Sequence, residues 1–264
     1  MKILGIDTSS KFLNIALSED EDIIKEESYL LDRRHASQLV PKVKELLKKY
    51  RTPISKIDVF IIGLGPGSFT GLRIGVSAIK GFGIASGKPC IGVASIDSIA
   101  CNAQENNKDI IPIIDAKRGQ VYAAIYRRKG NKVARLSDYL ILPIEKLLKK
   151  VEPRGLKLVT PSSLLPMGRN PEPEGHLSID SSPWPSGEWI KDAPVFLGDG
   201  VPLYRNNIAS INKKAVFLEE EYWYPGAGNL IKLGFSKIKK AKKINLAKLI
   251  PLYLYPENCQ IRKP

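Results

Sequence analysis

The stretch whose residue types and spacing best suit chemistry runs from Gly63 to Gly75 and reads GLGPGSFTGLRIG. Glycine tolerates positive φ, so Gly65 and Gly67 permit a tight turn after the apolar run that precedes them. Ser68 or Thr70 can then cap a helix, which leaves backbone N–H groups free at its start. Such a helix start suits an anion, for example a phosphate group.

The familiar phosphate-binding loops do not match this stretch. A P-loop requires Lys followed by Ser or Thr after its last glycine, whereas Leu72 and Arg73 follow Gly71. The dinucleotide-binding spacing G-x-G-x-x-G also fails, because Ser68 stands where the last glycine is needed. Two interpretations therefore stay open: an anion or partner-peptide site, and a turn that only brings a helix close to its strand.

The elements around this stretch predict a mixed sheet with helices on its faces. Apolar runs and alternating patterns predict strands at about 3–6, 13–17, 23–30, 58–64 and 90–93. Apolar positions at helical spacing predict helices from His35 to Tyr50, from Thr70 to a stop at Gly87, and from Ser95 onward. The resulting order β-β-β-α-β-α-β-α indicates the α/β class.

A second segment repeats the beginning of the chain. The sequence IIPIIDAKRGQVYAAIY from Ile110 resembles KILGIDTSSKFLNIAL, so that Asp7 corresponds to Asp115 and Ala16 to Ala124. This repeat predicts two similar domains in tandem, with the two aspartates facing each other across a cleft. The expected division is 1–104 joined by a helix at 226–243, and 105–225 with 244–264.

Proline marks one long interruption in the second copy. Seven prolines between 161 and 194, with serines and glycines, predict a loop insertion without regular structure. After it, we expect a strand at 195–197, a helix from Gly226 and a last strand at 250–255.

Composition narrows the classes of function. Lys and Arg number 41 against 27 Asp and Glu, and the resulting charge of +14 favours polyanionic surroundings such as RNA, although many of the lysines are scattered over helix faces. Cys90, Cys101 and Cys259 form no C-x-x-C pair, which argues against a disulfide framework or a zinc site. No apolar run approaches the roughly 20 residues of a membrane span, so we expect a cytoplasmic protein.

Five segments together resemble the bacterial TsaB family, also called YeaZ. They are MKILGIDTSS, RRHASQLVPKVKELL, GLGPGSFTGLRIG, IDAKRGQVYAAIY and PLYLYPEN. The resemblance implies an actin- and hexokinase-like fold of two related domains, each with a mixed sheet flanked by helices. It also implies a non-catalytic partner of a TsaD-type transferase and a TsaE-type ATPase, which together make threonylcarbamoyladenosine in tRNA. Alone, such a chain is expected to form a homodimer.

The histidine positions are consistent with a partner that has no catalytic site of its own. In the transferase, two histidines four apart hold a metal, and their positions fall here on Ser95 and Ile99. His35 and His176 are the only histidines, so no metal is expected. His35, just before a helix, is expected at the surface or as a cap.

Asp7 resembles the hairpin aspartate that serves metal-phosphate chemistry in sugar kinases of the implied fold. Asp7, Ser9, Gly65, Gly67, Ser68, Thr70 and Asp115 are therefore candidates for a nucleotide or anion site. ATP or ADP at a subunit interface is the cofactor that this set allows, and an ATP-dependent phosphotransferase is the alternative function. A carboxylate that only caps its own turn, Asp7–Ser10, is the competing interpretation.

Small residues suggest where a partner docks. Gly71, Gly75 and Ala78 share one side of the predicted helix, and interior glycine costs roughly 1 kcal/mol against alanine, so a close neighbour is implied. The resemblance points to paired helices from each subunit. We therefore expect a partner interface formed by His35, Leu39, Gly71, Arg73, Gly75 and Ala78.

Overall fold

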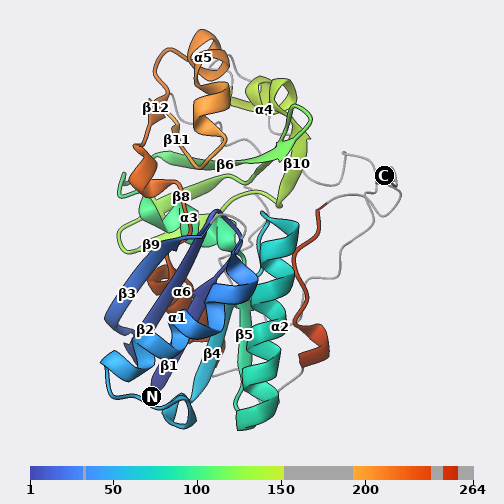
Figure 1. Cartoon of the computed structure of the whole chain (residues 1–264). Helices are drawn as coiled ribbons and strands as arrows, with labels where there is room; N and C mark the ends of the chain where they lie inside the picture. Colours follow the sequence, from blue (N-terminus) through green and yellow to red (C-terminus); the bar gives the residue numbers. More distant parts are fainter. Residues whose placement is uncertain (32–33, 152–192, 239–245, 255–264) are drawn as a thin grey trace, which may run out of the picture.

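A computed structural model describes residues 1–31, 34–151, 193–238 and 246–254 (Figure 1). Its first sheet has the strand order β3-β2-β1-β4-β5, in which β1 pairs antiparallel with β2 and parallel with β4. The strands are β1 (Lys2–Asp7), β2 (Phe12–Glu19), β3 (Asp22–Leu30), β4 (Val59–Gly63) and β5 (Cys90–Val93). β4 is buried throughout, as its uniformly apolar sequence requires.

Helices cover both faces of this sheet (Figure 1). α1 (His35–Lys49) and α2 (Phe69–Ser86) pack on one face, where Leu4, Ile6, Leu13 and Ile15 meet their apolar stripes. α6 (Ala227–Ile238) packs on the other face against Ile3, Ala16, Val59 and Ile61. α2 ends at Gly87 in the left-handed conformation, which confirms the stop expected there.

The second sheet has the order β10-β7-β6-β11-β12, and β8 pairs with β6 and β9. Its strands are β6 (Asp109–Lys117), β7 (Gln120–Ala123), β8 (Tyr126–Lys129), β9 (Lys132–Arg135), β10 (Leu140–Pro143), β11 (Val195–Leu197) and β12 (Val216–Phe217). The remaining helices are α3 (Ser95–Asn102), α4 (Ile144–Val151), α5 (Val201–Ile211) and the short η1 (Ile54–Lys56), η3 (Glu220–Tyr222) and η4 (Leu246–Lys248).

The two sheets repeat one topology. In each, a central strand pairs antiparallel with the strand that follows it and parallel with a later strand on its other side: β1 with β2 and β4, β6 with β7 and β11. Two mixed sheets flanked by helices are therefore present, as the sequence predicted. The domain boundaries expected from the sequence stay a prediction.

Two sequence expectations concern the later part of the chain. The strand expected at 250–255 is wrong for 250–254, which have no ladder: only the Leu252 N–H donates to the Leu64 carbonyl, at 2.8 Å. Leu249 and Leu252 pack against the core under α2 instead, so these leucines serve packing rather than strand pairing. The loop insertion 161–194, except for its last two residues, lies outside the described residues.

In the described ranges, no helix combines the length and the apolar character needed to cross a bilayer.

Candidate functional site

Asp7 lies at the end of β1 with its carboxylate completely buried. Oδ1 accepts hydrogen bonds from the Ser9 backbone N–H at 2.7 Å and from Ser9 Oγ at 2.6 Å. Oδ2 accepts from Ser95 Oγ at 2.6 Å. Burial raises the pKa of Asp7, and the hydrogen bonds from Ser9 and Ser95 oppose that rise. Both oxygens are thus occupied inside the protein, as expected for a carboxylate that caps its own turn.

The same serines hold the glycine-rich turn. The Gly65 N–H donates to Ser95 Oγ at 2.9 Å, and the Ser95 N–H donates to the Gly65 carbonyl at 2.7 Å. The Ser68 N–H donates to the Ser9 carbonyl at 2.7 Å. A Cβ on Gly67 would lie 2.2 Å from that carbonyl oxygen, so only glycine fits there. Gly65 has φ +94°, which confirms the positive φ expected at this position.

Five candidates therefore meet at one place, and two lie apart. Asp7, Ser9, Gly65, Gly67 and Ser68 form one connected turn, and Ser68 Oγ caps α2 by accepting from the Gly71 N–H at 3.2 Å. Thr70 is exposed in the first turn of α2. The expectation that Asp7 faces a cleft is wrong, because Ser9, Ser95 and the end of β4 at Gly63 enclose its carboxylate.

Asp115 belongs to the second sheet. Its Oδ1 accepts from the Lys117 N–H at 2.8 Å, and its Oδ2 lies 2.5 Å from Lys117 Nζ. The Asp115 N–H donates to Asp199 Oδ1 at 3.0 Å. Burial raises the pKa of Asp199, and the neighbouring Asp115 carboxylate adds to this rise. Asp199 lies in the turn Gly198-Asp199-Gly200, which follows β11 as the Gly65 turn follows β4.

The positions that correspond to the transferase's histidines have structural partners. Ser95 makes the contacts with Asp7 and Gly65, and Ile99 is 2% exposed in the apolar core around α3. In the part of the chain that the structure describes, no three His, Cys, Asp or Glu side chains lie close enough together to hold a metal ion.

The predicted partner interface needs correction. A Cβ on Gly71 would lie 2.0 Å from the Thr8 carbonyl oxygen, and one on Gly75 would lie 2.2 Å from Thr8 Oγ1. Both glycines therefore face the chain's own β1. They let α2 approach the end of that strand, where Thr8 Oγ1 donates to the Gly71 carbonyl at 2.7 Å. The premise that this stripe is left for a partner helix is wrong.

His35 and Leu39 are buried as well. His35 is 4% exposed, with Nε2 3.2 Å from the Phe12 carbonyl oxygen, and Leu39 is 1% exposed in the core. The expectation of a surface or capping histidine is wrong, because α1 begins at His35 and turns this side chain toward β2. Of the predicted interface, Arg73 is exposed and Ala78 is half-buried.

Arg73 belongs to an aromatic cluster that sequence reasoning missed. Its guanidinium carbon lies 3.7 Å from the centre of the Phe69 ring, and its Nε donates to Tyr253 Oη at 3.3 Å. Phe69 and Tyr253 are 46% and 41% exposed, with ring centres 5.5 Å apart. Helical spacing of i and i+4 places Phe69 beside Arg73, but no spacing rule could have added Tyr253, which is 180 residues further along the chain.

α3 connects the turn to the second sheet. In the first turn of this helix, Asp97 accepts hydrogen bonds from Tyr126 Oη at 2.6 Å and from Tyr139 Oη at 2.9 Å. Asp97 is 5% exposed, and burial raises its pKa. Ser98 Oγ on the same helix donates to the Gly226 carbonyl at the beginning of α6. One short helix thus bonds the Gly65 turn, the second sheet and α6.

The family model described as "TsaD: tRNA N6-adenosine threonylcarbamoyltransferase" matches residues 28–257. The chain belongs to this family. Curated relatives include the tRNA threonylcarbamoyladenosine biosynthesis protein TsaB of Bacillus subtilis (36% identical over 131 residues) and that of Escherichia coli K12 (34% over 135 residues). Each alignment covers 50% of this chain, and the chain spans 57% and 58% of those relatives' lengths. These names confirm the resemblance to TsaB.

Solved structures support the same fold. A structure described as YeaZ from Pseudomonas aeruginosa is 21% identical and aligns with a TM-score of 0.66 over 96% of this chain and 99% of its own. A second, described as an uncharacterized protein from P. aeruginosa with similarity to peptidase YEAZ, gives 0.68 at 20% identity with the same coverage. At this identity the likeness concerns the fold, and the fold class expected from the sequence is confirmed.

Proposed function

We propose that this chain acts in the synthesis of threonylcarbamoyladenosine in tRNA, as a non-catalytic partner of a TsaD-type transferase and a TsaE-type ATPase. The observation that carries the proposal is the set of curated relatives named for this biosynthesis, together with the family model that covers most of the chain. ATP or ADP at a subunit interface remains part of the proposal, and tRNA is the substrate of the complex.

The geometry around Asp7 supports the non-catalytic part. A carboxylate that binds a metal-phosphate group must present at least one oxygen to the ligand. Here Ser9 and Ser95 donate to both oxygens, and the side chain has no exposed surface. Ser95 also takes the position at which the transferase carries a metal-binding histidine. The residues that could have built a phosphate site instead bond to one another.

The aromatic cluster of Phe69, Arg73 and Tyr253 is the docking point that we propose in place of the small-residue stripe. Partly exposed Arg and aromatic side chains are typical of the residues that dominate binding energy at protein interfaces. Stacking on Phe69 and the contact with Tyr253 hold the guanidinium in one place, which lowers the entropy lost on binding.

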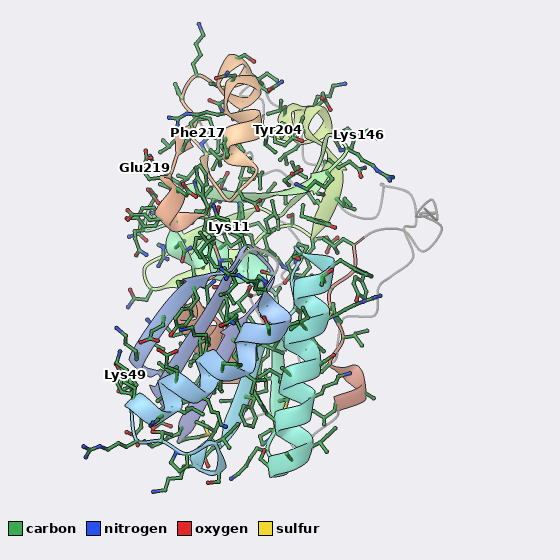
Figure 2. The ribbon with its side chains drawn as sticks, in the orientation of Figure 1. Lys11, Lys49, Lys146, Tyr204, Phe217 and Glu219 are labelled. Atoms are coloured by element: carbon green, nitrogen blue, oxygen red, sulfur yellow. The ribbon has the colours of Figure 1, made fainter. Side chains whose placement is uncertain are left out.

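Reconstitution tests the proposal. Purified transferase and ATPase should modify tRNA efficiently only when this chain is added, and the chain alone should show no transfer. The variant Arg73→Ala should weaken the complex by about tenfold or more, since truncating a hot-spot side chain costs roughly 2 kcal/mol. Arg205→Ala is the matched control, because Arg205 is also exposed and lies over the ring of Phe217. Phe217 belongs to β12 of the second sheet (Figure 2).

Two results would contradict this proposal. Full modification without the chain would remove its role as a partner. ATP turnover by the chain alone, abolished by Asp7→Asn, would favour the phosphotransferase alternative. Equal binding by Arg73→Ala and Arg205→Ala would refute the docking point and leave the partner role standing.

A further inference from the structure

A groove of about 490 Å³ lies beside β3, away from the turn and from the aromatic cluster. α6 packs over β1, β2, β4 and β5 and leaves most of the outer strand uncovered. One wall of the groove comes from β3, with Ile23 and Glu26, and the other from η3 and the residues that lead into α6, with Glu221 and Tyr224. The floor is formed by Phe12 and Asn14 of β2.

Amide side chains hold the far wall in place. Asn14 Nδ2 donates to the Pro225 carbonyl at 2.9 Å. Asn102 Nδ2 donates to the carbonyls of Tyr222 and Tyr224, each at 2.9 Å, and Asn229 Nδ2 donates to Asn102 Oδ1 at 2.8 Å. These donors are used within the protein, so the groove has a fixed shape. Glu220 is also engaged, by Lys11 and Tyr224, so the carboxylates of Glu26 and Glu221 are the ones that face an added ligand.

The charge of the groove is opposite to that of the chain. Glu26, Glu220 and Glu221 line it against two ammonium groups, that of Lys232 in the lining and that of Lys11 at one end, in a protein whose formal charge is +14. Glu26 makes no hydrogen bond or ion pair with any described residue. At one end, Lys11 Nζ lies 3.0 Å from Glu220 Oε1 and about 5 Å from the ring centres of Phe12 (5.4 Å) and Tyr224 (5.1 Å). That corner already accommodates an ammonium group between rings and a carboxylate.

β3 adds an unpaired backbone edge. It is the outermost strand of the first sheet, and nothing in the described ranges pairs with its outer side (Figure 1). The edge is nine residues long, from Asp22 to Leu30, and Ile24 and Leu30 are 41% and 54% exposed along it. Such an edge can accept an added strand from another chain.

We propose that the β3 edge and its groove form a second docking surface, which receives a lysine- or arginine-rich extended segment of a partner protein. The segment adds a strand to β3, and its cationic side chains reach Glu26 and Glu221. Charge complementarity selects this occupant, since the groove's carboxylates outnumber its ammonium groups and would repel the phosphates of RNA, and a second copy of this chain carries the same acidic groove. The surface is independent of the proposed function and of the Phe69–Arg73–Tyr253 cluster.

A labelled peptide of alternating lysine and valine tests this surface by fluorescence anisotropy. Wild-type protein should bind it, and the double variant Glu26→Lys, Glu221→Lys should bind at least about tenfold more weakly. The single variant Glu26→Lys is compared with Glu45→Lys as its matched control, because Glu45 is an exposed glutamate on α1 and each variant reverses one surface charge. A peptide with the same side chains but N-methylated on alternate residues should lose binding, since strand addition requires the backbone N–H groups.

The proposal is overturned if the wild-type protein does not bind the lysine–valine peptide, or if the double variant binds it as well as Glu45→Lys does. Equal binding of the N-methylated peptide would also overturn it, because simple charge attraction would then suffice. Sedimentation without peptide gives a further check: self-association lost only in the double variant would make the groove a contact between copies. Circular dichroism should show the same secondary-structure content in all variants. If the wild-type protein bound single-stranded RNA more tightly than the peptide, the proposed occupant would be wrong.

Discussion

Replacing Ser95 by alanine should destabilise the protein strongly, because this hydroxyl serves two buried partners. It donates to Asp7 Oδ2 at 2.6 Å and accepts from the Gly65 N–H at 2.9 Å. Leaving a buried polar group without its partner costs about 1–3 kcal/mol, so the two losses together amount to about 2–6 kcal/mol. Total folding stability is typically about 5–15 kcal/mol, so the effect is a large share of it.

Urea unfolding followed by circular dichroism measures this loss. With an m-value of about 2–3 kcal/mol/M, the midpoint should fall by roughly 0.7–3 M. Ser77→Ala is the matched control, because Ser77 is exposed on α2 and should change the midpoint little. The double variant with Asp7→Asn separates the contributions: because Ser95 and Asp7 contact each other, the two costs should not add.

The pH dependence of the same variant has a definite sign. Burial raises the pKa of Asp7, so the native state binds the Asp7 proton more tightly than the unfolded state does. The contribution of Asp7 to the free energy of unfolding therefore falls as pH rises above about 3.9. Ser95→Ala removes a hydrogen bond that lowers this pKa, so its cost should be largest at neutral pH and smaller toward acid. A cost equal to that of Ser77→Ala, or one that adds fully to Asp7→Asn, would refute the reasoning.

Two further predictions concern packing and charge. Gly75→Ala should lower the free energy of unfolding by about 1–3 kcal/mol, because its Cβ would lie 2.2 Å from Thr8 Oγ1. In the same urea assay, Gly81→Ala should raise it by up to about 1 kcal/mol, because a Cβ there would have nothing within 4 Å. Equal effects of the two substitutions would contradict the assignment of the glycine face. Tyr139→Phe removes a donor to the buried Asp97 carboxylate and should raise the pKa of Asp97 further, so the loss of stability that begins above about pH 3.9 should continue to a higher pH than in the wild type. Parallel profiles of urea midpoint against pH would show that this hydrogen bond has no effect.

Local patterns predicted the first half of the chain well. The apolar runs at β1 and β4 and the alternation in β2 set the first sheet, and Gly87 ended α2 as expected, because these signals act within a few residues. The segment at 250–254 shows the limit of such reasoning. Its apolar residues satisfy the pattern of a strand, yet Ile250 and Tyr253 are exposed, and the packing of Leu252 and Leu254 against the cores fixes the segment without a ladder.

The sequence predicted which residues form the candidate site better than it predicted what each of them contacts. Asp7, Ser9 and the glycine turn were grouped correctly, but the decisive donor, Ser95, lies 88 positions from Asp7. The glycine stripe failed for a related reason. Helical spacing shows which residues share a face, whereas the neighbour of that face depends on which strand end the helix crosses, here Thr8.

The crossing of α6 over the first sheet has a consequence for synthesis of the chain. Ile3, Ala16, Val59 and Ile61 are covered by α6, and β4 ends at Gly63, 164 residues before α6 begins at Ala227. At a translation rate of about 5–20 residues per second, that apolar face stays uncovered for roughly 8–33 s before α6 is synthesised. During this interval the nascent first sheet resembles an aggregation-prone intermediate, and a message truncated before α6 would release a protein fixed in that state.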